Sequence, residues 1–332
     1  MKVYRFAILS FAHLHAYSYA AVVRNLPNTE LVAIFDDNRE RLYEVGRKFG
    51  VNKLYYDYEE LLRKEELDAV IVTSENARHR EMVTTATERG VHVLCEKPIA
   101  TSLEDADEMI ASAERAGVKL QIAFVMRYHP ATVKVKEIID AGEIGKILTI
   151  TSTNHGKYPG GWFGIPELSG GGAIMDHTVH VADLMRWYTG SEVVEVHAYI
   201  GENIRPHLRC EDCALISLRF KDGTISSIDC SWSRPDEWPI WGDVFLQIIG
   251  TEGCIVVDAF RSAVHYAGGG TPLTWASFGT NPDEEMIKHF VKVIEEDLEP
   301  RASGVDGKKA LEIALAAYLS NERGRPIELP LR

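Results

Sequence analysis

The chain has 332 residues, of which 45% are hydrophobic and 26% charged, and its formal net charge is −13. This length predicts two domains, and an acidic excess without a basic cluster argues against binding to nucleic acid or to an anionic membrane surface. The five cysteines are sparse and odd in number, which is typical of a reduced cytoplasmic protein. No run reaches the ~20 apolar residues that span a bilayer, and polar residues interrupt the first apolar run too early for a signal peptide.

Short apolar runs alternate with helical stretches over the first third of the chain. The strands are uniformly apolar rather than alternating, which indicates a parallel sheet covered on both faces, a doubly wound α/β domain over residues 1–124. We expect strands at 3–9, 31–35, 69–73, 91–94 and 120–124, and helices at 16–26, from the Asp36-Asp37-Asn38 turn to Phe49, at 78–88 and at 103–116.

The pattern changes after Phe124, and residues 125–332 are expected to form a second domain of the α+β class. Strands dominate from 193 to 257, where alternation and an Asp222-Gly223 turn predict an open, mainly antiparallel sheet. Further elements are expected at 130–141 (helix), 146–153 (strand), 170–188 (a glycine run leading into a helix), 283–296 (helix) and 306–323 (helix).

The first candidate site is the turn after the first strand, where a dinucleotide-binding fold places its glycine-rich loop. Ser10 and Ala12 are small enough to let the backbone approach a diphosphate, but His15 stands where the third glycine is expected. His13 and His15 can either donate to phosphate or simply fill the turn, and the sequence does not separate these alternatives.

The second candidate is Asp36, which ends the second strand. A carboxylate at this place can receive the adenosine ribose hydroxyls, and it repels a 2′-phosphate, so it favours NAD over NADP. The alternative is that Asp36 or Asp37 caps the following helix.

The third candidate combines two segments. Lys97 follows the strand at 91–94, at the strand end where doubly wound proteins bind ligands. Asp176 and His180 follow a glycine run and share a face if their segment is an α-helix. An imidazole that accepts a hydroxyl proton and an ammonium group that stabilises the oxygen are what alcohol oxidation needs. Each motif alone is more often structural than catalytic.

Together these motifs resemble the glucose-fructose oxidoreductase/inositol dehydrogenase (Gfo/Idh/MocA) family. The resemblance rests on Glu96-Lys97-Pro98 and on Gly170-Gly171-Gly172 followed by Asp176 and His180, and it extends over nearly the whole chain. Supporting stretches are Ser74-Glu75-Asn76-Ala77-Arg78-His79, Met126-Arg127-Tyr128-His129-Pro130, Glu211-Asp212 and Gly250-Thr251-Glu252-Gly253.

The resemblance implies an N-terminal NAD(P) domain and a C-terminal domain whose open sheet forms an oligomer, here a homodimer or homotetramer. It implies that His180 accepts the proton, Asp176 contacts or orients substrate and Lys97 polarises the reacting oxygen, with a cis peptide before Pro98. The implied cofactor contacts are Ser10, Ala12, His13, His15, Asp36, Ser74, Asn76, His79, Glu96 and Lys97. The expected substrate contacts are Arg127, His155, Tyr158, Trp162, Asp176, His177 and His180, with Trp232, Trp238 and Trp241 as further aromatic candidates.

We therefore expect an NAD-dependent oxidoreductase that acts on a secondary alcohol of a sugar, an inositol or a similar polyol. One alternative is an enzyme that retains NAD and processes glycosides without net redox change. Another is a catalytically silent NAD or sugar sensor, although such a sensor need not keep Lys97, Asp176 and His180. No metal is expected, because Cys210 and Cys213 form a lone CxxC without a second ligand pair.

Overall fold

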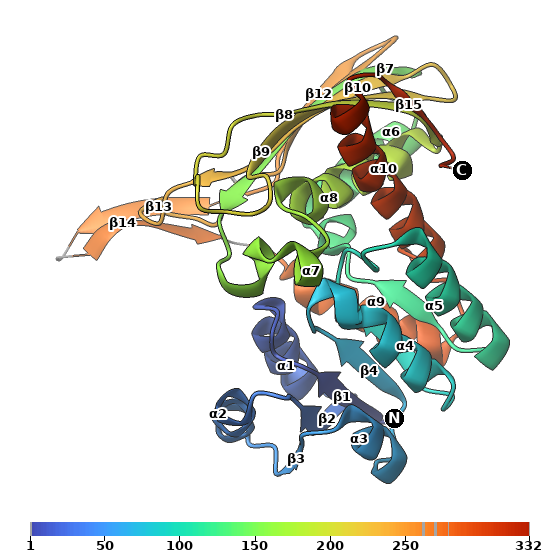
Figure 1. The fold of residues 1–332 in the computed structure, drawn as a ribbon, viewed down its shortest axis with the longest axis vertical. Coiled ribbons are helices and arrows are strands. Elements are labelled where there is room, and N and C mark those ends of the chain that lie inside the picture. The colour runs from blue at the N-terminus through green and yellow to red at the C-terminus, as the bar shows by residue number, and fades with distance from the viewer. Residues whose placement is uncertain (1, 261–262, 269–270, 278, 332) are drawn as a thin grey trace. The chain divides into compact units, whose positions relative to one another are not determined.

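The computed structural model describes residues 2–260, 263–268, 271–277 and 279–331, and it divides into two compact units (Figure 1). The first unit comprises Met1–Val125 and Asn281–Lys308, and the second comprises Met126–Thr280 and Lys309–Arg332. The sequence-based division assigned all of 125–332 to the second domain. In the structure, residues 281–308 belong to the first unit, so both units are discontinuous in sequence.

Six parallel strands form the sheet of the first unit, in the order β3-β2-β1-β4-β5-β6. Ile8 at the centre of β1 lies opposite Ile34 of β2 and Ile71 of β4, and every residue of β4 is buried. This confirms the doubly wound class. The strands are β1 Tyr4–Leu9, β2 Thr29–Phe35, β3 Lys53–Tyr55, β4 Ala69–Val72, β5 His92–Cys95 and β6 Leu120–Ile122.

The helices of the first unit form two groups. Helix α1 packs against α2 and α9, and α4 packs against α3 and α5. The buried Phe290 ring of α9 lies 6.4 Å from that of Phe6 in β1, which explains why this late segment joins the first unit. The helices are α1 His15–Asn25, α2 Arg39–Phe49, α3 Tyr58–Lys64, α4 His79–Thr87, α5 Leu103–Ala116 and α9 Pro282–Glu295. The sequence patterns did not indicate β3 or α3, which are short.

The start of α2 corrects one expectation. The cap is Asn38, whose side chain accepts the backbone N–H of Arg41, and neither Asp36 nor Asp37 caps the helix. Asn38 lies one residue before the first helical turn, where a side-chain oxygen reaches the free amides. The helix ends as expected at Gly50, whose φ of 63° is in the left-handed region.

Seven strands form the main sheet of the second unit, in the order β12-β11-β7-β10-β9-β8-β15. All neighbours are antiparallel except β7 and β10, which are parallel. The Asp222-Gly223 turn joins β9 to β10 as predicted. The strands are β7 Ile147–Lys157, β8 Val193–Ile200, β9 Cys213–Phe220, β10 Ile225–Arg234, β11 Phe245–Gly250, β12 Cys254–Asp258 and β15 Ile327–Glu328, and a separate hairpin contains β13 Ala263–Gly268 and β14 Thr271–Ser277.

Helices cover one face of this sheet and leave the other exposed. Helix α8 packs against β7 and α6, and the backbone N–H of Ala198 in β8 donates to Ser320 Oγ in α10 at 3.0 Å. In β9 the residues alternate, with Ile216 buried and Leu215 exposed. The helices are α6 Pro130–Asp140, α7 Pro166–Ser169, α8 Val179–Thr189 and α10 Gly304–Arg323.

Candidate active site

The turn between β1 and α1 contains no glycine, yet it adopts a backbone that favours one. Ser10 has a φ of 77°, in the left-handed region. Its Oγ accepts the Ala12 N–H at 3.1 Å, and its carbonyl accepts the Thr73 hydroxyl at 2.6 Å. Local hydrogen bonds therefore hold a serine where the dinucleotide fingerprint has its first glycine.

Both histidines of this turn face Glu96, which follows β5 and is wholly buried. His15 Nδ1 lies 2.9 Å from Glu96 Oε1, and His13 Nε2 lies 3.9 Å from Oε2. The hydroxyl of Tyr19 in α1 donates to Oε1 at 2.6 Å. The imidazoles thus fill the turn and pair with the carboxylate of the Glu96-Lys97-Pro98 motif, a partner that the sequence did not indicate.

Opposite charges in this cluster shift the pKa values of its members. Burial alone would raise the pKa of Glu96, but His13, His15 and Lys97 hold it well below its usual range. Burial opposes protonation of His15, yet Glu96 raises the pKa of its imidazole above the ordinary value. Glu96 is therefore ionised at neutral pH, and its charge favours protonation of His15.

The same three side chains are the only group among the described residues whose ligand atoms cluster closely enough to hold a metal ion. One ligand atom each from His13, His15 and Glu96 lies within 4.8 Å of the others. However, His13 Nδ1 accepts the backbone N–H of His15 at 3.2 Å, so the proton of neutral His13 is on Nε2, the nitrogen that faces Glu96. A protonated nitrogen cannot ligate a metal, and the cluster is better described as a hydrogen-bonded pair of imidazoles on a carboxylate.

Asp36 lies at the end of β2, fully buried and with its carboxylate occupied. Oδ2 accepts the Phe11 N–H at 2.7 Å and Oδ1 accepts the Asn38 N–H at 2.8 Å. The Arg41 guanidinium binds both oxygens, with Nε 2.7 Å from Oδ2 and Nη2 2.8 Å from Oδ1. The sequence analysis did not indicate this cation beside the predicted ribose site. Arg41 lies five residues after Asp36, in the first turn of α2.

The remaining predicted cofactor residues of the first unit lie in and directly after the turns that follow β4 and β5, and the Lys97-Pro98 bond in the second of these turns is cis as expected. Lys97 is buried, and its backbone N–H donates to Glu96 Oε2 at 3.1 Å. His79 Nδ1 lies 3.0 Å from the Pro98 carbonyl and Nε2 lies 3.3 Å from the Ser74 carbonyl. His79 thus connects the turn after β4 to the turn after β5. Asn76, in the same turn, is buried as well.

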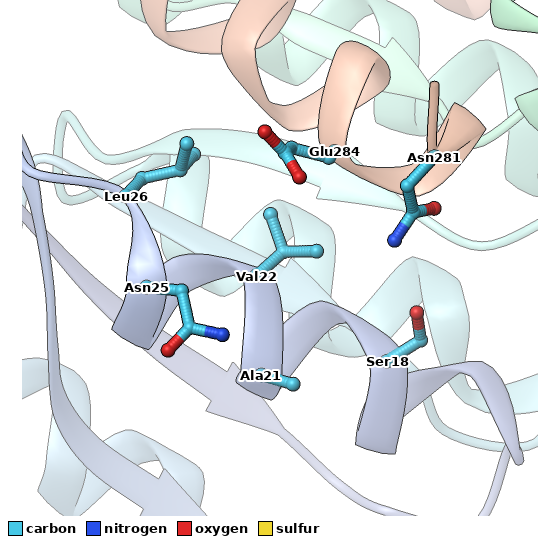
Figure 2. Close-up of a pocket in the computed structure, with 7 residues that line it drawn as sticks. All are labelled: Ser18, Ala21, Val22, Asn25, Leu26, Asn281 and Glu284. Atoms are coloured by element: carbon cyan, nitrogen blue, oxygen red, sulfur yellow. The ribbon is translucent and has the colours of Figure 1, made fainter. Parts of the chain in front are cut away.

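A separate hollow of about 280 Å³ lies between α1 and α9 (Figure 2). Ser18 on its rim donates a hydrogen bond to Asp283 at the start of α9. Its lining contains the carboxylate of Glu284 but no lysine, arginine or histidine. We assign this hollow no part in the chemistry. The lining residues are Ser18, Ala21, Val22, Asn25, Leu26, Asn281 and Glu284.

In the second unit, the glycine run before Asp176 packs directly on Glu211 and Tyr318. A Cβ on Gly172 would lie 1.8 Å from the Glu211 carbonyl oxygen, and one on Gly171 would lie 2.0 Å from the Tyr318 hydroxyl. The buried Glu211 carboxylate accepts the Ile174 N–H at 2.8 Å and the Tyr318 hydroxyl at 2.8 Å. The glycines are therefore required for close approach to the residues that hold the start of the next helical segment.

That segment is not a plain α-helix. Ile174–Thr178 form a π-helical turn, and the α-helix starts at Val179. Asp176 lies in the π-turn and His180 in α8, so the α-helical argument for their common face does not apply. Isolated π-turns occur frequently at functional sites, but the apolar periodicity of the sequence gives no sign of one.

Asp176 is buried and receives two contacts on one oxygen. Trp232 Nε1 donates to Oδ2 at 2.9 Å, and His177 Nε2 lies 3.3 Å from the same atom. The imidazole that contacts Asp176 within the second unit is that of its neighbour His177. Trp232 is completely buried, so it binds Asp176 through its indole N–H and packs through its rings.

Two predicted substrate residues have other roles in the structure. The buried Arg127 guanidinium binds both oxygens of Asp183 in α8, at 2.7 and 2.6 Å. His155 lies between two carboxylates, with Nδ1 3.2 Å from Asp243 and Nε2 3.0 Å from Asp229. Gly156 lies next to His177. Since neighbouring residues of a strand point to opposite faces, the His155 side chain lies on the other face of the sheet from His177.

Three of the aromatic candidates, Tyr158, Trp162 and Trp232, form a packed cluster beside Asp176, whereas Trp238 and Trp241 are exposed. The Tyr158 and Trp232 rings lie 5.2 Å apart, and Trp162 stacks on Phe163 at 3.9 Å. Tyr158 and Trp162 are only partly buried, so their outer surfaces are accessible in the second unit.

Two family models match the chain. The model described as an oxidoreductase family with an NAD-binding Rossmann fold matches residues 5–124, and the GFO/IDH/MocA C-terminal domain model matches residues 132–256. D-apiose dehydrogenase of Paraburkholderia graminis is 30% identical over 96% of this chain and 86% of its own length. Myo-inositol 2-dehydrogenase of Thermotoga maritima is 32% identical over 94% of each chain. The crystal structure of a probable dehydrogenase from Thermotoga maritima has a TM-score of 0.85 and 30% identity over 98% of both chains.

No helix in the described ranges is both long enough and apolar enough to cross a membrane.

Proposed function

The chain belongs to the GFO/IDH/MocA family of NAD-binding oxidoreductases, and from this premise we propose that it transfers a hydride between NAD and a secondary alcohol of a sugar, an inositol or a similar polyol. One observation carries the proposal. The family's motif lies at a ligand-binding position of the fold, because Lys97 follows the buried Glu96 at the end of an inner parallel strand. Strand ends of this kind are where doubly wound folds bind their ligands.

We assign the catalytic roles by motif. Lys97 holds the reacting oxygen as negative charge develops on it, and His180 accepts the hydroxyl proton. Asp176, fixed by Trp232 in the second unit, accepts a hydrogen bond from the substrate. These three assignments are proposals about one reaction, and kinetics of single variants test each of them.

For the cofactor, we propose that the glycine-free turn receives the diphosphate through Ser10, Ala12, His13 and His15. His15 begins α1 and its side chain is 40% exposed, so its ring can reach a ligand while Nδ1 stays on Glu96. A helix N-terminus and a cationic ring both favour an anion. Asp36 is proposed to receive the adenosine ribose in exchange for part of its contact with the partly exposed Arg41 guanidinium, and Ser74 and Asn76 to approach the nicotinamide half. His79 supports Pro98 rather than the cofactor.

For the substrate, we propose Tyr158, Trp162 and His180 as contacts in addition to Asp176, whereas His177 is left out because its two ring nitrogens face Asn154 and Asp176. Partly exposed aromatic surfaces beside polar groups suit a polyol. Arg127 and His155 are left out of this set, because their polar atoms bind Asp183, Asp229 and Asp243.

We propose that the chain is a cytoplasmic homodimer or homotetramer that buries the open face of the seven-stranded sheet. Exposed apolar side chains on this face come from three neighbouring strands on one side of β7 and two on its other side: Tyr199, Leu215, Ile225, Ile249 and Val256. Contiguous apolar surface of this kind marks an interface. Light scattering of the wild type and of Leu215→Lys tests this, and a monomeric wild type would refute it.

The experiment that tests the function is a screen of NAD⁺ reduction over inositols, aldoses and simple glycosides, with NADP⁺ in parallel. NADH formation with a polyol or sugar, lost in Lys97→Ala, is the expected result. A protein that binds NAD but reduces none of it, and instead cleaves a glycoside without net redox change, would replace the proposal with the NAD-retaining alternative.

A further inference from the structure

The ring of His177 has an oxygen atom at each nitrogen. Nδ1 lies 2.8 Å from the backbone carbonyl of Asn154, and Nε2 lies 3.3 Å from Asp176 Oδ2. A carbonyl oxygen only accepts hydrogen bonds, so Nδ1 carries a proton. Both His177 and Asp176 are buried, so these two contacts determine which protonation states of the ring are favourable.

The protonation of Nδ1 leaves two possibilities for Nε2. If His177 were neutral, the lone pair of Nε2 would face an ionised Asp176, which is unfavourable in a buried place. A second proton must lie between the two residues. Because Trp232 Nε1–H donates to the same Asp176 oxygen at 2.9 Å, and a donor of this kind favours the charged carboxylate, the proton belongs on His177. The pair is an imidazolium and a carboxylate.

Packing holds the imidazole in this one orientation. A Cβ on Gly156 would lie 2.8 Å from His177 Cε1 and 3.1 Å from Nε2, so only glycine leaves room for the ring. The carbonyl that binds Nδ1 belongs to Asn154, whose side-chain Nδ2 donates to the Asp243 carbonyl at 2.9 Å. The acceptor for Nδ1 is therefore itself anchored in the sheet.

We propose that His177 is a positioning residue: as an imidazolium it keeps Asp176 ionised and oriented, so that Asp176 accepts a hydrogen bond from the substrate hydroxyl but does not take its proton. Protonating Asp176 would weaken the hydrogen bond from Trp232 and remove the ion pair with His177, which makes Asp176 a poor base. The proton of the alcohol then goes to His180. This role rests on the proposed function, whereas the ion pair itself rests only on the contacts of His177.

The ion pair is tested by ¹⁵N NMR of the full chain labelled at histidine nitrogens, with the His177 signals assigned by their loss in His177→Gln. Near neutral pH, both ring nitrogens of His177 should show the shifts and couplings of an imidazolium. In Asp176→Asn the same ring should become neutral with its proton on Nδ1. A neutral ring in the wild type, in either tautomer, or an imidazolium that persists in Asp176→Asn, would overturn the proposal.

The positioning role is tested by kinetics on the best substrate. His177→Gln should lower kcat by about 10²-fold, as expected for a misplaced catalytic group, with NAD affinity unchanged. Gly156→Ala keeps every functional group but displaces the ring, and it should lower kcat in the same direction by a smaller factor.

Two matched substitutions control for general damage. Gly253→Ala adds a Cβ that would lie 3.3 Å from Ile144 Cγ2, and His207→Gln changes an exposed histidine. Both variants should leave kcat within about two-fold of the wild-type value. If His177→Gln and Gly156→Ala only lower the melting temperature and keep kcat, the positioning role is wrong. If the wild type turns over no substrate at all, the proposed function fails, while the NMR result still decides on the ion pair.

Discussion

His15 Nδ1 lies 2.9 Å from Glu96 Oε1, and this contact joins the turn after β1 to the residue that follows β5. The pairing raises the pKa of His15 and lowers that of Glu96. A raised histidine pKa adds stability that is fully present below the ordinary value of about 6.5 and is lost as the pH rises through the folded value. The lowered Glu96 pKa adds stability that is present above the ordinary carboxyl value and is lost in acid.

We therefore expect His15→Gln to lower the free energy of unfolding most near pH 6, with the difference from wild type shrinking as the pH rises past neutrality. Urea unfolding at a series of pH values between 6 and 9 measures this, with the exposed His207→Gln as control. A difference that stays constant with pH would mean that packing, and not charge, is what His15 contributes.

Ser10 offers a test of backbone conformation. Ser10→Gly relieves the left-handed φ, worth about 1 kcal/mol, but loses the Oγ bond to Ala12, worth about the same, so stability should change little. Ser10→Ala keeps the unfavourable φ and loses the bond, and should destabilise by about 1 kcal/mol. Thermal unfolding compares the two. Equal stability of the glycine and alanine variants would contradict the argument.

Cofactor preference tests the role that we propose for Asp36 and its partner Arg41. With Asp36 in place we expect NADH to bind more tightly than NADPH. Asp36→Ala removes the carboxylate and releases the guanidinium that it binds. The ratio of the NADPH to the NADH dissociation constant should therefore fall by about 10-fold or more, equivalent to ~1.4 kcal/mol. Fluorescence titration with both cofactors measures the change.

The double variant Asp36→Ala, Arg41→Met separates the two residues. It lacks the released cation, and NADPH should bind to it less tightly than to Asp36→Ala. Equal or tighter binding of NADPH than of NADH by the wild type would refute the assignment of Asp36.

Lys97→Ala should abolish turnover while the cofactor still binds. Removal of one preorganised donor at a developing charge costs on the order of 10²–10³ in kcat. Isothermal titration for NAD, together with steady-state rates, distinguishes this from misfolding. A stable Lys97→Ala protein that binds NAD and keeps near-normal kcat would end the assignment.

His180→Ala should show a similar loss with partial recovery at high pH, where hydroxide can take the proton. The pH dependence of kcat measures this recovery. A loss that is independent of pH would show that His180 is not the proton acceptor.

The CxxC sequence should be chemically inert. Burial raises the pKa of Cys210 to about 11, so its thiol is protonated at neutral pH. Its Sγ lies near the Phe163 carbonyl, while Cys213 Sγ lies near that of Glu202. Cys210→Ser and Cys213→Ser should leave activity and metal content unchanged. Stoichiometric zinc in the purified wild type, lost in either variant, would show a site here.

The fold was largely predictable, because every strand of the first sheet except the short edge strand β3 carries its own apolar run. The apolar runs do not show which elements pack against or pair with one another. The helix pattern at 283–296 predicted α9, but nothing local shows that Phe290 packs near Phe6 of the first strand. Likewise, the alternation of β10 gives its inward face but not its parallel pairing with β7.

The candidate site was predictable at the level of motifs and not of contacts. Asp176 follows a recognisable glycine run, yet its bond to Trp232 joins residues 56 positions apart. Arg127 carried the right chemistry for a substrate contact, but Asp183 neutralises it in the buried interior. Polar residues of the same type serve binding or packing according to partners that only the folded chain brings together.

The return of residues 281–308 to the first unit has a consequence for synthesis on the ribosome. Residues 1–125 emerge first but lack α9, which supplies Phe290 to their core, and they lack the Ala302 carbonyl that accepts the Ile122 N–H at 2.9 Å. The nucleotide-binding unit can therefore be completed only after nearly the entire chain has been translated. A nascent chain stalled before residue 281 should be open to proteases along the surface of β1 and α1 that α9 later covers.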